Sequence, residues 1–199
     1  TDDQRREAIQ AYWASIEFMD AQVGRVVGAL EQLGLAENTV VVMTSDHGYH
    51  MYEHGLWQKR SLFENSARVP LVISAPGMAG NGRSTTALAE LVALHPTLAE
   101  LCVLSAPDYV DGVSQVPVLQ DPAAHVRDAA LTQVRHGQVD GYSLRTARYR
   151  YTIWNDGQAG EQLYDHQSDP LEMRNLAADP ALAELKGELK ARIAAEAAR

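Results

Sequence analysis

Residues 4–33 carry apolar side chains at three- and four-residue steps, the spacing that puts them on one face of an α-helix. Gly34 follows the last of them, and glycine commonly ends helices because it tolerates a left-handed backbone. We therefore predict one long amphipathic helix, and we interpret Tyr12 and Trp13 on its apolar face as core residues. The residues of this face are Ile9, Tyr12, Trp13, Ile16, Met19, Val23, Val26, Val27, Leu30 and Leu33.

A short apolar run, Val40–Met43, comes after a polar connection over residues 35–38. Its continuous, mostly β-branched character is typical of a parallel strand covered on both faces. Ligands of open α/β sheets bind just past the carboxyl ends of such strands. Asp46 and His47 occupy that place, and Gly48 lets the backbone turn where a side chain would collide. A helix linked so closely to a strand predicts an α/β layer.

The middle of the chain contains further predicted elements. Residues 61–67 suit a helical turn, and the apolar run 69–74 predicts a second strand. Residues 85–104 suggest a helical stretch that breaks near His95–Pro96. Cys102 lies in an apolar helical context, so we expect it to be a small core residue.

The pattern changes from about residue 125, and we predict a domain boundary near residue 120. Short runs rich in β-branched and aromatic residues, punctuated by glycine, predict a small antiparallel sheet. Residues 181–198, rich in alanine, leucine and charged residues, predict a terminal helix. The predicted strands are Ala129–Val134, Gly141–Thr146, Tyr149–Trp154 and Gln162–Tyr164.

Composition narrows the function classes. The formal net charge of -9 argues against a nucleic-acid partner, since phosphate binding needs a basic surface. We therefore interpret Arg145 and the segment 149–151 as exposed strand faces. No apolar run is long enough to cross a membrane, no signal peptide is recognisable, and one cysteine excludes an internal disulfide. The chain begins with Thr1, so we expect a processed or truncated piece. The sequence does not assign a cellular compartment.

The residues after the first predicted strand are rich in side chains that bind metals and anions. Three histidines (His47, His50 and His54) fall close to Asp46 and Lys59. The pair Asp46–His47 alone would suit a capping acid and a loop histidine. The density of such residues, mixed with aromatic side chains that a solvated face seldom carries, favours a functional site instead.

Several segments together resemble one family. In order and spacing they are similar to the C-terminal half of a sulfatase, and most to the iduronate-2-sulfatase-like branch of the alkaline phosphatase superfamily. The resemblance covers nearly the whole chain. The segments are Ser45–His50, Glu53–Lys59, Ser61–Glu64, Arg68–Leu71, Ala75–Gly77, Gly141–Thr146, Tyr149–Thr152, Glu161–Asp165, Asp169–Pro170 and Asn175–Leu176.

The resemblance implies a fold class and a division into domains. The fold class is α/β, with the C-terminal part of an alkaline-phosphatase-like α/β sandwich over residues 1–120. A small antiparallel sheet with a terminal helix follows over residues 121–199.

The resemblance also implies roles for Asp46, His47 and Lys59, and His50 and His54 are further candidates in the same segment. Asp46 and His47 would bind a divalent cation, Ca²⁺ or alternatively Mg²⁺, although histidine is an unusual Ca²⁺ ligand and His47 could instead donate a hydrogen bond to sulfate. Lys59, with His47, would act in catalysis, and its ammonium group would bind the sulfate. His50 and His54 would contact substrate. The alternatives are a surface Lys59 paired with Glu64, a solvated His50, and a His54 that braces the loop.

The sulfatase nucleophile is a formylglycine made from Cys or Ser in a Cys-x-Pro-x-Arg motif, which this chain lacks. The family's first pair of metal-binding aspartates is also absent. We therefore expect a sulfatase fragment that is inactive alone and needs an N-terminal sulfatase chain or segment. The expected substrate is a small sulfate ester or a sulfated saccharide. The alternatives are a phosphonate monoester hydrolase or phosphodiesterase of the same superfamily, and a non-catalytic binding module.

Overall fold

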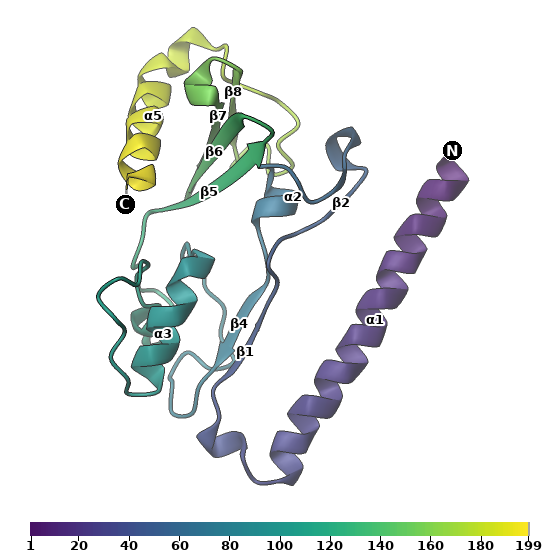
Figure 1. Cartoon of the computed structure of the whole chain (residues 1–199), viewed down its shortest axis with the longest axis vertical. Coiled ribbons are helices and arrows are strands. Elements are labelled where there is room, and N and C mark those ends of the chain that lie inside the picture. Colours follow the sequence, from purple (N-terminus) through teal and green to yellow (C-terminus); the bar gives the residue numbers. More distant parts are fainter. Residues whose placement is uncertain (199) are drawn as a thin grey trace.

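The computed structural model describes residues 1–198, and helix α1 (Asp2–Gln32) opens the chain as a long rod at one side of the molecule (Figure 1). Thr1 and Gln4 form a capping box, and two acidic residues lie in the first turn, where they favour the positive end of the helix. The predicted helix over residues 4–33 is confirmed.

The predicted core packing of Tyr12 and Trp13 is wrong for the described residues, because none of the residues of α1 is buried. Trp13 is 59% exposed and Phe18 is 70% exposed. The helix touches the following loop where the Tyr12 and Tyr49 rings lie 5.0 Å apart and where Arg5 covers the Tyr52 ring. The periodicity of a helix shows that it has an apolar face, but it cannot show what covers that face.

Strand β1 (Val41–Thr44) pairs with β4 (Leu71–Ser74) in an antiparallel ribbon, with Val41 opposite Ser74 and Thr44 opposite Leu71. Among the described residues this ribbon forms a sheet of its own, and Met43 and Val72 are exposed. The prediction of a parallel strand covered on both faces is therefore wrong here. An apolar run indicates a tendency to be buried, but it carries no information on the direction of the partner strand.

A short hairpin and a helical turn connect β1 to β4. The hairpin consists of β2 (His50–Met51) and β3 (Trp57–Gln58), joined by a 3₁₀ turn over Glu53–Gly55. The predicted helical turn is confirmed as α2 (Glu64–Ala67), shorter than the range 61–67.

The middle segment differs from its prediction. Residues 85–90 are not helical, and helix α3 (Leu94–Leu101) follows a 3₁₀ turn over Leu91–Ala93. Pro96 lies in the first turn of α3, where a missing backbone N–H breaks no helical bond, so it does not interrupt the helix. Cys102 ends α3 and is exposed, which corrects its assignment to the core. The short helix α4 (Val116–Gln120) follows.

The C-terminal part is the predicted antiparallel sheet with its terminal helix. Strands follow one another in the order β5–β6–β7–β8, and α5 (Ala183–Ala197) covers one face (Figure 1). Leu144 and Leu163 are fully buried there against Leu189 and Ile193 of the helix. The strand bounds are Ala129–His136, Val139–Thr146, Tyr149–Trp154 and Gly160–Asp165.

The interpretation of residues 149–151 as an exposed face is wrong, because Arg150 and Tyr151 are 2% and 1% exposed. Strand β7 lies between β6 and β8, so both of its edges are paired, and other elements cover its two faces. Tyr151 joins the core beneath α5, and Arg150 joins a polar cluster with Glu64 and Glu172. The division at residue 120 stays a prediction. Within residues 1–198, no helix combines the length and the hydropathy that a membrane span requires.

Candidate active site

Asp46 and His47 lie just after the end of β1, as predicted, and their side chains face each other. His47 Nδ1 is 2.7 Å from the carbonyl oxygen of Gly48. A carbonyl oxygen can only accept, so Nδ1 carries the proton and donates. The other ring nitrogen, Nε2, is 3.4 Å from Asp46 Oδ2. In the neutral ring, two lone pairs therefore meet at this point, and they repel unless a proton or a cation joins them.

The dimensions of this pair suit a hard cation. Ca²⁺ binds oxygen at about 2.3–2.6 Å, so two neighbouring ligand atoms at right angles lie roughly 3.3–3.7 Å apart, whereas the shorter bonds of Mg²⁺, about 2.0–2.1 Å, would bring them closer. The Asp46 side chain is 82% exposed, which leaves its outer oxygen open to an ion. The donor set therefore fits two positions in the coordination sphere of a divalent cation.

The charge of Asp46 is favoured by its neighbours. Desolvation acts to raise the pKa of this carboxyl, but the His47 ring, backbone N–H groups and the Lys59 charge hold it below its usual value. Lys59 is exposed, in the segment that follows β3. The structure thus brings Asp46, His47 and Lys59 into one electrostatic neighbourhood. Glu64 pairs with Arg150 and Arg145, so the surface pair of Lys59 with Glu64 is not formed.

Gly48 holds the backbone next to Asp46 and His47 against helix α2. Its N–H donates to the carbonyl oxygen of Ser66 at 2.8 Å. A Cβ atom at this position would lie 1.9 Å from the backbone oxygen of Asn65. No other residue fits without moving the backbone of α2, so the glycine after His47 is required for close packing.

His50 lies on the inner side of the same loop. It is 1% exposed, and its Nε2 is 2.7 Å from Ser61 Oγ, which in turn donates to Ser66 Oγ at 3.0 Å. Burial lowers the pKa of His50, and Nδ1 is buried without a hydrogen-bond partner within residues 1–198. The ring is therefore neutral, and it ties the start of the hairpin to the residues that follow Lys59.

His54 stacks on Phe63, with ring centroids 3.9 Å apart and planes 6° from parallel. Its ring also meets the edge of His50. The five predicted residues thus form two groups. Asp46, His47 and Lys59 face outward, whereas His50 and His54 pack toward Phe63.

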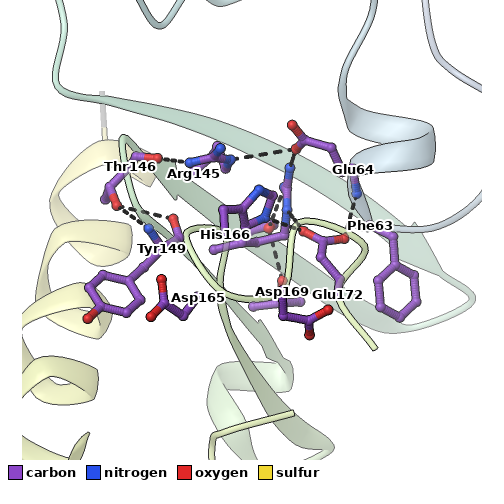
Figure 2. Close-up of polar contacts among 12 residues, drawn as sticks. Phe63, Glu64, Arg145, Thr146, Tyr149, Asp165, His166, Asp169 and Glu172 are labelled. Carbon is purple, nitrogen blue, oxygen red and sulfur yellow. Dashed lines mark hydrogen bonds and ion pairs between the residues drawn. The ribbon is translucent and has the colours of Figure 1, made fainter. Parts of the chain in front are cut away.

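Sequence reasoning missed a third cluster, formed by Glu64, His166 and Glu172, whose side chains converge in Figure 2. Their ligand atoms lie within 4.8 Å of one another. Arg150, however, makes ion pairs with both carboxylates, so the cationic position is already taken by a guanidinium. This arrangement suits a structural ion-pair cluster better than a metal site. Nothing in the strand pattern indicated it, because Arg150 alternates with apolar residues as an exposed arginine would.

Two family models match the chain. The sulfatase model matches residues 1–102, and the model "N-sulphoglucosamine sulphohydrolase, C-terminal" matches residues 52–199. The chain belongs to the sulfatase family. The resemblance seen in the sequence motifs is thereby confirmed.

Individual sulfatases are also similar to this chain in sequence. The chain is 36% identical to the choline-sulfatase of Rhizobium meliloti (strain 1021) over 193 residues, covering 90% of this chain and 35% of the relative. It is 33% identical to the iduronate 2-sulfatase of Mus musculus over 253 residues, covering 89% of this chain and 45% of the relative. The chain thus spans less than half the length of these relatives.

Solved structures confirm the α/β sulfatase fold. One neighbour was solved in complex with its substrate D-glucosamine-2-N,6-O-disulfate. It has a TM-score of 0.82 at 27% identity, over 89% of this chain and 37% of the neighbour. The phosphonate monoester hydrolase of Agrobacterium radiobacter has a TM-score of 0.79 at 29% identity, over 90% of this chain and 39% of the neighbour.

Proposed function

We propose that this chain supplies the cation-binding and sulfate-binding side of a sulfatase active site. The observation that carries the proposal is the convergence of Asp46 Oδ2 and His47 Nε2 at 3.4 Å beside the charge of Lys59. Asp46 and His47 would hold a divalent cation, Ca²⁺ or Mg²⁺. When bound, this ion would offset the negative charge of the sulfate oxygens.

Four residues of this chain would each have a part in the proposed active site. The Lys59 ammonium is a compact charge on a flexible stem, suited to a tetrahedral anion. It would neutralise charge on the sulfate group as the ester bond breaks. His47 keeps its Nδ1 proton on the Gly48 carbonyl, so its Nε2 stays directed at the shared site. His54 would border the substrate, and His50 would support the loop from within.

The nucleophile would come from another polypeptide segment. The chain contains no Cys-x-Pro-x-Arg motif, and Cys102 precedes Val-Leu-Ser-Ala. An N-terminal sulfatase chain or segment with the formylglycine would complete the site. The exposed apolar residues of α1 and of the β1–β4 ribbon, such as Phe18 and Val72, support this pairing because such surfaces favour burial against a partner.

The relatives support a substrate class for the proposal. A neighbour binds a disulfated glucosamine and a relative is a choline-sulfatase, which supports a sulfated saccharide or a small sulfate ester. Phosphonate monoester hydrolysis is the second candidate, because a solved hydrolase of that kind matches the fold nearly as well, with a TM-score of 0.79 against 0.82. A non-catalytic binding module is the third.

The test combines this chain with a sulfatase N-terminal segment that carries formylglycine, assayed on aryl sulfates and aryl phosphonates. We expect no turnover by the isolated chain, and turnover of sulfate esters by the combination. Asp46→Asn should abolish most of the turnover of sulfate esters by the combination. Lys59→Ala should lower its kcat/KM by about 10²–10³-fold. Asp108→Asn, an exposed aspartate elsewhere, is the matched control. Sulfatase turnover by the isolated chain, or a preference for phosphonates, would overturn the proposal.

A further inference from the structure

A buried polar cluster connects the C-terminal sheet to the residues beside Asp46 and His47. Its two central members, Arg150 and Glu172, are each only 2% exposed. Arg150 comes from β7, and Glu172 comes from the turn that follows β8. Arg150 donates to Glu172, to Glu64 and, at 3.0 Å, to Ser143 Oγ. The guanidinium thus joins the sheet, the turn and the start of α2.

Glu172 makes the second link to α2. One carboxylate oxygen accepts the backbone N–H of Glu64 at 2.8 Å, and the other lies 2.8 Å from His166 Nε2 (Figure 2). The N–H groups of the first helical turn have no partner within the helix, so a carboxylate placed there caps it. Here the cap comes from a residue 108 positions away in the sequence.

The backbone of Glu172 is held in an uncommon conformation. Its φ is 57°, in the left-handed region that residues other than glycine avoid. Such conformations persist where the surrounding contacts determine them. Here these contacts are the hydrogen bonds of the Glu172 carboxylate to Arg150, His166 and the Glu64 N–H.

Two hydrogen bonds of Ser66 connect helix α2 to the residues beside the predicted site. The carbonyl oxygen of Ser66 accepts the N–H of Gly48, the residue after His47. The hydroxyl of Ser66 accepts from Ser61, which holds the His50 ring. Because a Cβ at Gly48 would collide with α2, the backbone at this contact has no room to slide. A shift of α2 would therefore move Asp46 and His47.

We propose that Glu172 is a positioning residue, which caps α2 from the C-terminal sheet and thereby holds Asp46 and His47 in the geometry that binds the cation. This inference rests on the proposed function for its consequence in catalysis. Its structural part, the coupling of Glu172 to Gly48, stands independently. An ordinary structural ion pair would stabilise the whole fold without acting on Gly48 in particular.

The first test uses the 199-residue chain and hydrogen exchange of backbone amides, read by NMR. Glu172→Gln keeps the shape of the side chain, removes its charge and leaves one acceptor oxygen where the carboxylate has two, so the side chain can no longer accept from the Glu64 N–H and from Arg150 and His166 together. We expect the Gly48 amide to lose protection by about tenfold or more, while the amides of β6 keep theirs. Glu161→Gln is the matched control, because Glu161 pairs with Lys186 at 3.0 Å on the same sheet without touching α2. It should leave Gly48 unchanged.

Unchanged protection of Gly48 in Glu172→Gln would overturn the proposal. So would a loss shared equally by Gly48 and β6, or an equal effect of Glu161→Gln, since either would indicate general destabilisation. Substitution with Gln is preferred over Ala because it leaves no cavity that could prevent folding.

The second test uses the combination with the formylglycine segment. Glu172→Gln should raise the Ca²⁺ concentration needed for half-maximal activity, with kcat restored at saturating Ca²⁺. Reduced kcat at saturating Ca²⁺ with an unchanged Ca²⁺ requirement would contradict the positioning role. If Gly48 loses protection but the unsubstituted combination is inactive on sulfate esters, the proposed function fails and the coupling stands.

Discussion

Helices α1 and α5 differ in a way that their sequences do not reveal. Helix α1 has 31 residues and a long apolar repeat, yet none of its residues is buried within the described structure. Helix α5 has 15 residues, and it buries Leu189 and Ile193 against the four-stranded sheet. The tendency of a segment to form a helix is set locally by propensity and caps. Burial needs a complementary surface, and of these two helices only α5 has one within the described residues.

The comparison also separates two sources of stability. Most helix stability in proteins comes from packing of an apolar face, and isolated helices are marginal in water. The sheet with α5 contains the large buried side chains and the buried ion pairs. We therefore expect the sheet side to unfold cooperatively and α1 to unfold by itself, at lower temperature or denaturant concentration.

The largest effect is expected at the buried guanidinium. Arg150→Ala leaves Glu172 without its cationic partner, and breaking a buried pair costs about 3–5 kcal/mol. Arg25→Ala is the matched substitution on α1, where the exposed arginine contacts Gln22, and it should cost less than about 0.5 kcal/mol. Urea unfolding of both variants measures the difference. Equal costs would break the contrast between the two regions.

Apolar truncations sharpen the same contrast. Leu144→Ala removes a side chain that is 0% exposed, so the cavity should cost about 2–5 kcal/mol. Phe18→Ala removes a larger side chain that is 70% exposed, so the unfolding midpoint of the sheet should not move. Thermal unfolding followed by circular dichroism checks both. A large loss from Phe18→Ala would mean that a second copy or another segment covers α1 in solution.

Acid should act on the sheet side through Glu172. Burial acts to raise the pKa of this carboxyl, but His166, Arg150 and the Glu64 N–H together hold it below the ordinary value of 4.5. The unfolded chain then binds the proton more readily, so this contribution to stability is present above pH 4.5 and is lost as pH falls through the lower folded pKa. The stability of Glu172→Gln should depend less steeply on pH below 4.5. Parallel curves for the two proteins would contradict this assignment.

The smallest effect concerns α1 alone. Gly24 and Gly28 lie in the middle of the helix, and among the described residues no atom outside the nearby helix backbone lies within 4 Å of a Cβ built at either position. Replacing each by Ala should stabilise the helix by about 0.5–1 kcal/mol. Amide exchange of α1 should slow, and the unfolding midpoint of the sheet should stay fixed. A shift of the sheet midpoint would show that the two regions unfold together.

Local patterns in the sequence were sufficient for most of the elements. The long helix, the β4 strand, the four-stranded sheet and the terminal helix follow from period, propensity and punctuation, because these act over a few residues. The motif around Asp46, His47 and Lys59 indicated the family for a similar reason. Its residue types and spacing lie within one short segment, so the motif can be recognised from the sequence alone.

Tertiary structure decided what these elements and side chains meet. The apolar run at β1 acquired an antiparallel partner, Pro96 opened a helix instead of breaking one, and Cys102 came to the surface. Arg150 was buried because Glu64 and Glu172, distant in sequence, supply the negative charge that makes burial of a guanidinium tolerable. Such pairings depend on contacts between remote positions, and a single sequence records residue types but not which of them come together.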